Sequence, residues 1–339
     1  MTKIVTGANR GLGYATARAL AADPSRTIVL AGRDLPGLTR AARRVQARTG
    51  NQRLLPMHLD LADLASVRAF VNEFRAGSLP PLTTIICNAG ISKPTVRERS
   101  ADGYEVVFAV NHLGHFLLVN LLLDCLLPPA RILFVSSGAH DLAEAQGPMQ
   151  PPRYIKAAWL AHPELDPDLP ADDAFAGGQA YATSKLCNLL CTYELARRLE
   201  GSGLSTPERP ITVHAFAPGL VAGTGLGRDE KAWTRFTWHF VLPVMSRLLG
   251  FGRTPAQAGA DLAYLATAPE LAGVTGKYFR GREMVVSSAD SYDQSKATDL
   301  WQTSIELSQL QPSESPLVQA NHPPPEHPEA SDPRPMRRI

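Results

Sequence analysis

The chain has 339 residues, of which 44% are hydrophobic, and its formal net charge at pH 7 is +2. The apolar content is enough for a sizeable core, and the length suits one α/β domain of roughly 250 residues with additional segments. A charge so close to balance gives no sign of a basic surface for nucleic acid, so we expect no nucleic-acid partner.

Short apolar runs alternate along the chain with amphipathic helical segments. The expected strands are 3–6, 27–31, 54–58, 84–87, 131–135 and 211–216, and the first three precede helices that end near residues 22, 48 and 75. Such alternation favours a parallel sheet with helices on both faces. The continuously apolar runs 85–87 and 132–135 suit strands that are buried on both sides. The predicted fold is a single doubly wound, Rossmann-like α/β domain over residues 1–310.

Two long segments interrupt this alternation. Residues 138–178 form an insertion rich in Pro, Ala, Asp and Gly, and residues 220–253 carry several aromatic side chains in an apolar stretch. Long excursions at the carboxyl edge of a sheet commonly shape a pocket. We interpret 220–253 as a substrate lid, with a packing or dimer helix as an equal alternative. Residues 311–339 are Pro-rich and polar, and we predict a disordered tail there.

Four cysteines, at positions 87, 125, 187 and 191, fall in apolar stretches without a Cys-x-x-Cys pair. We interpret them as reduced thiols of an intracellular protein and predict no metal site. We recognise no signal peptide before the first strand. The apolar stretch 117–127 contains Asn120 and Asp124, which is unlike a membrane span. We therefore expect a cytoplasmic protein without a transmembrane segment.

A glycine-rich turn, Thr-Gly-Ala-Asn-Arg-Gly-Leu-Gly, runs from Thr6 to Gly13 between the first strand and the helix after it. Glycines allow a tight turn and close approach of a pyrophosphate, and the helix N-terminus supplies N–H donors and the positive end of its dipole. The position of the turn indicates a dinucleotide site more strongly than the motif alone. The cofactor contacts expected here are Gly7, Asn9, Arg10, Gly11, Leu12 and Gly13.

The end of the second strand favours NADP(H) over NAD(H). An acidic residue at this place would bind the ribose 2′-hydroxyl of NAD, whereas Arg33 offers a planar fork for a 2′-phosphate and Arg10 is placed to reach the same group. Asp34 comes one residue later, and the alternative is that both arginines are ordinary surface charges. Later strand ends are expected to contribute Asp60, Leu61, Asn88, Ala89, Gly90, Pro218, Gly219 and Thr224.

Four residues in separate segments fit a hydride-transfer site: Asn111, Ser137, Tyr181 and Lys185. Tyr181 and Lys185 are four residues apart and share one face of a helix, so we expect the ammonium to lower the pKa of the phenol and make it a usable acid or base. Lys185 is also placed to hold the nicotinamide ribose. Ser137, preferred to Ser136 by strand alternation, is expected to polarise a substrate carbonyl. Asn111 is expected to order a helix end and to hold a water linked to Lys185.

These residues, with the glycine turn, Asn88-Ala89-Gly90 and Pro218-Gly219, resemble the short-chain dehydrogenase/reductase family across about residues 1–308. The resemblance implies a Rossmann-like fold, a nicotinamide cofactor, and a tetrad at Asn111, Ser137, Tyr181 and Lys185. Within the family, the segments 111–116 and 193–199 look like the branch of retinol dehydrogenases and light-dependent protochlorophyllide reductases.

The segment Ser184-Lys185-Leu186-Cys187-Asn188 looks more like the protochlorophyllide enzymes, which carry a functional cysteine at the position of Cys187. Two departures weaken this likeness. The photoenzymes usually have alanine where this chain has Gly90, and Gly223 replaces an expected threonine. We interpret Cys187 as core packing, and His112 and His115 as structural helix residues.

The leading hypothesis is an NADP(H)-dependent oxidoreductase that transfers a hydride between the nicotinamide and a carbonyl or alcohol of a lipophilic small molecule, with Tyr181 as acid or base. One alternative is a protochlorophyllide-type reductase that reduces a C=C bond under light. Another is a non-catalytic module that senses NADP(H). The apolar segments 117–127 and 182–199 fit either a homodimer interface or burial under the insertion.

Overall fold

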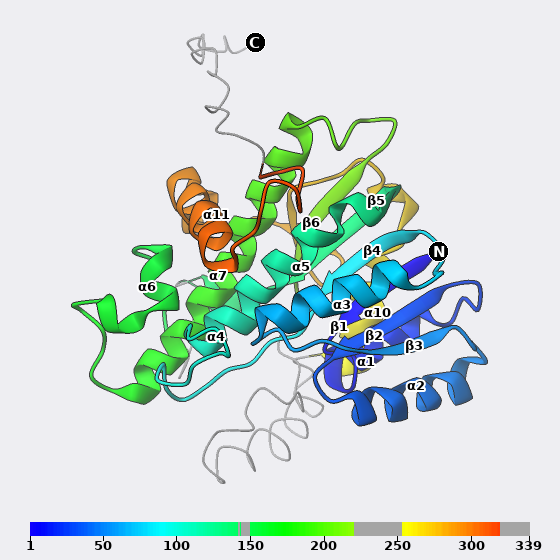
Figure 1. Ribbon diagram of the computed structural model, residues 1–339, viewed down its shortest axis with the longest axis horizontal. Coiled ribbons are helices and arrows are strands. Elements are labelled where there is room, and N and C mark those ends of the chain that lie inside the picture. The colour runs from blue at the N-terminus through cyan, green and yellow to red at the C-terminus, as the bar shows by residue number, and fades with distance from the viewer. Residues whose placement is uncertain (142, 144–149, 220–252, 319–339) are drawn as a thin grey trace, which may run out of the picture.

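The computed structural model describes residues 1–141, 143, 150–219 and 253–318. One sheet contains eight strands in the order β3-β2-β1-β4-β5-β6-β7-β8, and helices lie on both of its faces (Figure 1). The strands are β1 (Thr2–Thr6), β2 (Thr27–Gly32), β3 (Leu54–His58), β4 (Leu82–Cys87), β5 (Leu126–Val135), β6 (Ile211–Ala217), β7 (Lys277–Arg280) and β8 (Glu283–Val285). β1 to β7 are parallel, and β8 is antiparallel to β7. The predicted doubly wound fold is confirmed.

Side chains of the central strands alternate between two separate cores. One core lies under α1 (Gly11–Leu20), α2 (Leu35–Thr49) and α10 (Pro255–Leu265), and the other under α3 (Leu64–Ala76), α5 (Gly114–Leu122) and α7 (Asp173–Gly201). Ile4 and Ile85 belong to the second core, while their neighbours Val5 and Ile86 belong to the first. This period of two is the geometry of a strand covered on both faces.

Local sequence signals set the ends of the helices. The Asp34 side chain caps α2 by accepting from Gly37 N at 2.9 Å, and Gly50 ends that helix with a φ of 73°. Asp172 caps α7 by accepting from the backbone N–H groups of its first turn. Elements after residue 216, namely β7, β8, α10 and α11 (Gln294–Ser308), were not predicted from the sequence.

α11 packs outside α7 and α5 and forms a further layer (Figure 1). The Trp301 ring meets Phe116 of α5 edge-on, with ring centroids 4.9 Å apart, and Arg198 of α7 lies over Trp301 with its Cζ 4.7 Å from the ring centroid. α6 (Ala157–Ala161), from the 138–178 insertion, also contacts α11. The apolar faces of α5 and α7, for which the sequence left open a homodimer interface or burial, are therefore covered by other parts of the same chain. Much of this cover comes from α11.

The chain stays attached to the domain beyond α11. Leu317 is buried in the core, and the Ser315 hydroxyl donates to Asn120 Oδ1 of α5 at 3.0 Å. The prediction of a disordered tail from residue 311 is therefore wrong for residues 311–318. Residues 319–339 lie outside the described residues.

One continuous helical stretch, Val106–Cys125, is long and apolar enough to cross a membrane, and it is the only such stretch among the described residues. It contains α4 (Val106–Phe108), a π-helical turn at Ala109–Leu113, and α5. Its mean hydropathy is 1.8, and 89% of its most apolar window is buried inside the domain. Such burial is that of a core helix of a folded domain.

Candidate active site

The predicted site residues gather at the carboxyl edge of the parallel strands. β1 lies between β2 and β4, so the strand order reverses direction there. Crevices outside the carboxyl ends of strands at such a reversal are the usual ligand sites of open α/β sheets. The glycine turn follows β1, Asn88 follows β4, and Ser137 follows β5.

The glycine turn is pressed against the segment after β4. Gly7 has a φ of 66°, and a Cβ there would lie 3.0 Å from Ala89 Cα; a Cβ on Gly13 would lie 2.4 Å from Gly7 O. Asn88 holds the two segments together, because its Nδ2 donates to Thr6 O at 2.8 Å. Glycine at 7 and 13 is therefore required by the backbone conformation and by this close approach.

The start of α1 fits an anionic group. Arg10 occupies the N-cap position without a side-chain capping hydrogen bond, which leaves the N–H groups of the first turn as donors. Gly11 has a φ of 56°, and a Cβ there would have no atom of the described residues within 4 Å. The backbone thus offers donors beside open space, as binding of a pyrophosphate requires.

Two arginines lie on the predicted nucleotide edge. Arg10 and Arg33 are both exposed, and neither makes an ion pair with another described residue. Asp34, the acidic neighbour, is occupied: its Oδ1 accepts the capping bond from Gly37 N, and its Oδ2 lies 4.0 Å from Arg40 Nη2.

The remaining predicted cofactor contacts differ in what they could offer a nucleotide. Asp60 Oδ1 accepts from Ala62 N at 3.0 Å, and the Leu61 side chain belongs to the core, so Leu61 offers a nucleotide its backbone. Pro218 and Gly219 follow β6, and Gly219 has a φ of 73°. Thr224 and the predicted lid, apart from residue 253, lie outside the described residues.

Tyr181 and Ser137 meet across the gap between α7 and β5. The Ser137 side chain interacts with the Tyr181 phenol and opposes the rise of its pKa, whereas Ser136 is buried and its Oγ donates to Lys185 O at 2.8 Å. Of the two adjacent serines, Ser137 therefore contacts the phenol, as strand alternation predicts.

Lys185 lies one turn beyond Tyr181 on the same face of α7. Its Nζ donates to Val135 O at 3.1 Å and lies 5.5 Å from the centroid of the Tyr181 ring. Asn188, which the sequence analysis gave no role, donates to the same carbonyl through its Nδ2, also at 3.1 Å. The spacing of three residues from Lys185 along the helix is the signal that places it there.

Burial dominates the protonation of both groups. It raises the pKa of Tyr181 to about 12, although the hydrogen bond from Ser137 opposes the rise, and it lowers the pKa of Lys185 to about 8. The expectation that Lys185 would bring the phenol pKa below its ordinary value is therefore wrong here, because burial outweighs the one contribution that lowers this pKa, which comes from Ser137. At neutral pH Tyr181 holds its proton and Lys185 is mostly charged.

Asn111 joins the loop after β4 to α7. Its Nδ2 donates to Ile91 O and to Ser184 Oγ, both at 2.9 Å, and its Oδ1 accepts from Ile91 N at 2.8 Å. It lies in the π-helical turn at Ala109–Leu113, and such turns are frequent at functional sites. A Cβ on Gly90 would lie 3.3 Å from both Asn111 Oδ1 and Lys185 Nζ, so glycine allows these groups to come close.

The structure buries the residues that we interpret as structural. His115 Nε2 pairs with Thr6 Oγ1 at 2.9 Å, and His112 Nε2 pairs with Ser304 Oγ at 2.8 Å. Burial lowers the pKa of each histidine to about 3, so both are neutral. Cys187 is fully buried in an apolar cluster, and burial raises the pKa of its thiol. Among the described residues there is no cluster of potential metal ligands.

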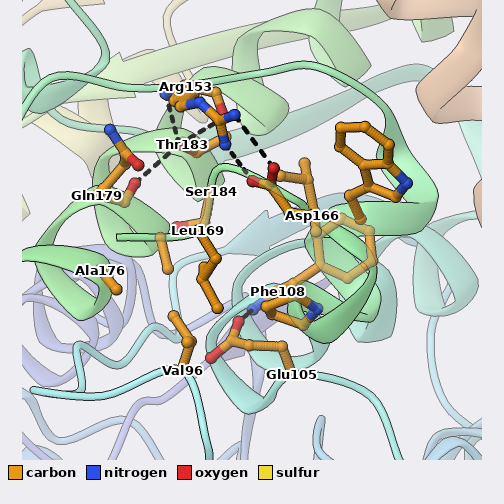
Figure 2. A pocket seen from close by; sticks show the side chains of 14 residues that line it. Val96, Glu105, Phe108, Arg153, Asp166, Leu169, Ala176, Gln179, Thr183 and Ser184 are labelled. Carbon is orange, nitrogen blue, oxygen red and sulfur yellow. Dashed lines mark hydrogen bonds and ion pairs between the residues drawn. The ribbon is translucent and has the colours of Figure 1, made fainter. Parts of the chain in front are cut away.

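A separate cavity of about 50 Å³ lies against another side of α7 (Figure 2). Ala180, Thr183 and Ser184 line it, and of the described residues that do so none is Tyr181 or Lys185. Arg153 and Asp166 form an ion pair at its wall. A cavity of this size holds about one or two waters, so we do not assign it to the substrate.

Comparison with known proteins identifies the family of this chain. The family described as short chain dehydrogenase matches residues 2–149. Human retinol dehydrogenase 13 is 37% identical over 309 residues, which cover 90% of this chain and 84% of that protein. Protochlorophyllide reductase A of Oryza sativa is 34% identical over 321 residues, covering 90% and 79%.

A solved structure extends the likeness to three dimensions. The crystal structure of an uncharacterised protein from Mycobacterium paratuberculosis matches with a TM-score of 0.63 and 30% identity, covering 91% of this chain and 93% of that chain. The fold and these matches show that the chain belongs to the short-chain dehydrogenase/reductase family of oxidoreductases, and it is similar to retinol dehydrogenases and protochlorophyllide reductases.

Proposed function

We propose that the protein is an NADP(H)-dependent oxidoreductase that interconverts a carbonyl and an alcohol on a lipophilic small molecule. The observation that carries the proposal is the Tyr181 phenol, which is protonated at neutral pH, interacts with Ser137, and lies on one helix face with the Lys185 ammonium. This arrangement offers a proton donor, an oxyanion partner and a fixed positive charge in one place.

The preference for NADP(H) rests on charge at the nucleotide edge. Arg33 and Arg10 are exposed there without ion-pair partners among the described residues. The carboxylate that would favour NAD, Asp34, is engaged in capping α2 and faces Arg40. A 2′-phosphate would find two guanidinium groups and little competition from this carboxylate.

NADPH, when bound, supplies the hydride. Ser137 donates a hydrogen bond to the substrate oxygen as negative charge develops on it, and Tyr181 donates its proton to the resulting alkoxide, which is the stronger base. Lys185 holds the ribose hydroxyls and stabilises the tyrosinate left behind. Val135 O, which Lys185 contacts in this structure, keeps its hydrogen bond from Asn188 when the ammonium turns to the ribose.

Two observations support a lipophilic substrate. Residues 220–253 are rich in apolar side chains, and the relative that is 37% identical is named a retinol dehydrogenase. The test is consumption of NADPH in the dark with a panel of aldehydes, ketones and quinones, using Tyr181→Phe as the matched control. The phenylalanine keeps the ring and removes the proton, so turnover should fall by about 10²–10⁴. Full turnover by Tyr181→Phe would refute the mechanism.

Light-driven reduction of a C=C bond is the second candidate, favoured by the 34% identity to protochlorophyllide reductase A. Against it, the Cys187 thiol is fully buried with a raised pKa and could not deliver a proton without a rearrangement of α7. Turnover that requires illumination would favour this candidate. NADPH binding without turnover, in light or dark, would favour a cofactor-sensing module.

A further inference from the structure

His140 is a buried histidine that the proposed mechanism does not use. It ends the single helical turn Gly138–His140 directly after Ser137. Its Nδ1 lies 2.6 Å from Ser137 O, and its Nε2 accepts a hydrogen bond from Ser288 N at 3.2 Å. Both ring nitrogens are therefore engaged with backbone groups, one of them in Ser137 itself.

These partners determine the tautomer. Ser288 N–H is a donor, so Nε2 must be the unprotonated nitrogen, and Nδ1 then carries the hydrogen and donates it to Ser137 O. Burial lowers the pKa of His140, which favours the same neutral ring. A proton on Nε2 would oppose the Ser288 N–H, so the contact specifies one form of the side chain.

The far partner of His140 is itself anchored to α7. The hydroxyls of Tyr193 and Ser287 lie 2.7 Å apart, and those of Ser287 and Ser291 lie 2.6 Å apart. The rings of Tyr193 and Tyr292 stack with centroids 4.9 Å apart. The segment beside Ser288 is thus fixed to the helix that carries Tyr181, whereas the Ser288 hydroxyl is buried without a hydrogen-bond partner among the described residues.

We propose that His140 is a positioning residue that holds Ser137 in the orientation from which its hydroxyl meets Tyr181. The Ser137 backbone is extended, with a φ of −159° and a ψ of 156°, and its carbonyl is tied through His140 to the segment anchored on α7. The Ser137 hydroxyl also accepts a hydrogen bond from Ala139 N at 3.3 Å, so the turn Gly138–His140 holds both its carbonyl and its side chain. This inference rests on the proposed function, in which Ser137 stabilises the developing oxyanion.

Two substitutions separate the two side-chain bonds of His140. His140→Asn places an amide donor where Nδ1 is and loses the contact to Ser288, whereas His140→Gln can accept from Ser288 N but loses the side-chain donor to Ser137 O. The backbone N–H of residue 140, which also donates to Ser137 O at 3.2 Å, stays in both variants. We expect kcat to fall by about tenfold in His140→Gln and to stay within about threefold of wild type in His140→Asn, with KM for NADPH unchanged in both. Equal losses in the two variants would overturn the proposal.

A double-mutant cycle with Ser137→Ala distinguishes a His140 that positions Ser137 from a His140 that only supports the fold. If His140 acts through Ser137, then His140→Gln should lower kcat less than twofold in the Ser137→Ala background. If the two substitutions together lower kcat by the product of their separate effects, His140 acts elsewhere. Ser288→Pro removes the N–H from the other side at a φ of −57°, which proline accepts. It should lower kcat by about threefold if Nε2 needs that donor, and an unchanged kcat would contradict this part of the inference.

Crystal structures of the variants give a readout that needs no turnover. The Ser137 hydroxyl should move away from the Tyr181 phenol in His140→Gln and keep its wild-type place in His140→Asn. Retention of the contact in both would overturn the inference even if the carbonyl panel were active. Conversely, an inactive wild-type protein would refute the proposed function, while the same crystal structures would still decide the role of His140.

Discussion

Replacing Asn111 with alanine tests whether this residue is mainly a structural clamp. The substitution removes three hydrogen bonds of 2.8–2.9 Å from a fully buried side chain, and it leaves the N–H and C=O of Ile91 without these partners. At about 1 kcal/mol for each hydrogen bond, the free energy of unfolding should fall by about 3 kcal/mol. Activity should fall as well, because the loop after β4 would no longer be held to α7.

The assay is urea unfolding followed by circular dichroism, with NADPH oxidation measured on the same preparations. Asn120→Ala is the matched control, because Asn120 is buried in the same helical stretch and makes two hydrogen bonds, to Phe116 O at 2.9 Å and from Ser315 Oγ at 3.0 Å. It should lose about 2 kcal/mol of unfolding free energy and keep the activity of each folded molecule.

The clamp interpretation fails if Asn111→Ala loses activity while its unfolding free energy stays within about 0.5 kcal/mol of wild type. That result would return Asn111 to the role expected from the sequence, a residue that holds a water linked to Lys185. A loss of stability without loss of activity would instead show that the loop finds its place without this amide.

Further predictions concern charge, cofactor and the chain end. Burial lowers the pKa of Lys3 from 10.5 to about 8, so between about pH 8 and pH 10 this side chain binds more protons in the unfolded chain than in the folded one. The unfolding free energy of wild type relative to Lys3→Met should therefore rise over that range, as urea titrations would show, because the opposite contribution of the buried cysteines, whose pKa values are raised, is common to both proteins. Arg33→Ala should raise KM for NADPH by about tenfold and leave KM for NADH nearly unchanged. Arg40→Ala is its control on the same surface, and equal KM shifts for both cofactors would contradict the 2′-phosphate assignment. Leu317→Ala should lower the unfolding free energy by about 2 kcal/mol, and no change in denaturation would place residues 311–318 outside the folded core.

The edge of the sheet that carries the site could be predicted because its signals are local. Strand alternation distinguished Ser137 from Ser136, and helical spacing placed Tyr181 with Lys185. The glycines after β1 predicted a tight turn, and Gly7 and Gly11 have positive φ angles there. Each of these depends on a few neighbouring residues and on a period of two or of 3.6.

What the sequence did not reveal depends on tertiary contacts. The sign of the Tyr181 pKa shift depends on how deeply α7 is buried, which no spacing of residues encodes. The role of Asn188 depends on a carbonyl of β5, and that of His140 depends on the N–H of distant Ser288. The segment 311–318 is locally polar and rich in Pro and Ser, and its burial depends on a site for Leu317 that distant helices provide.

The layer formed by α11 also bears on how copies of this chain can associate. A second chain that used α5 and α7 as its contact would first have to displace α11 and return the indole of Trp301 to water. Burying that one side chain is worth about 2–3 kcal/mol. The contribution of α11 comes from the same molecule, so it is independent of protein concentration, whereas the stability of an obligate dimer falls on dilution. A single chain thereby keeps the two helices beside its active site packed at any concentration.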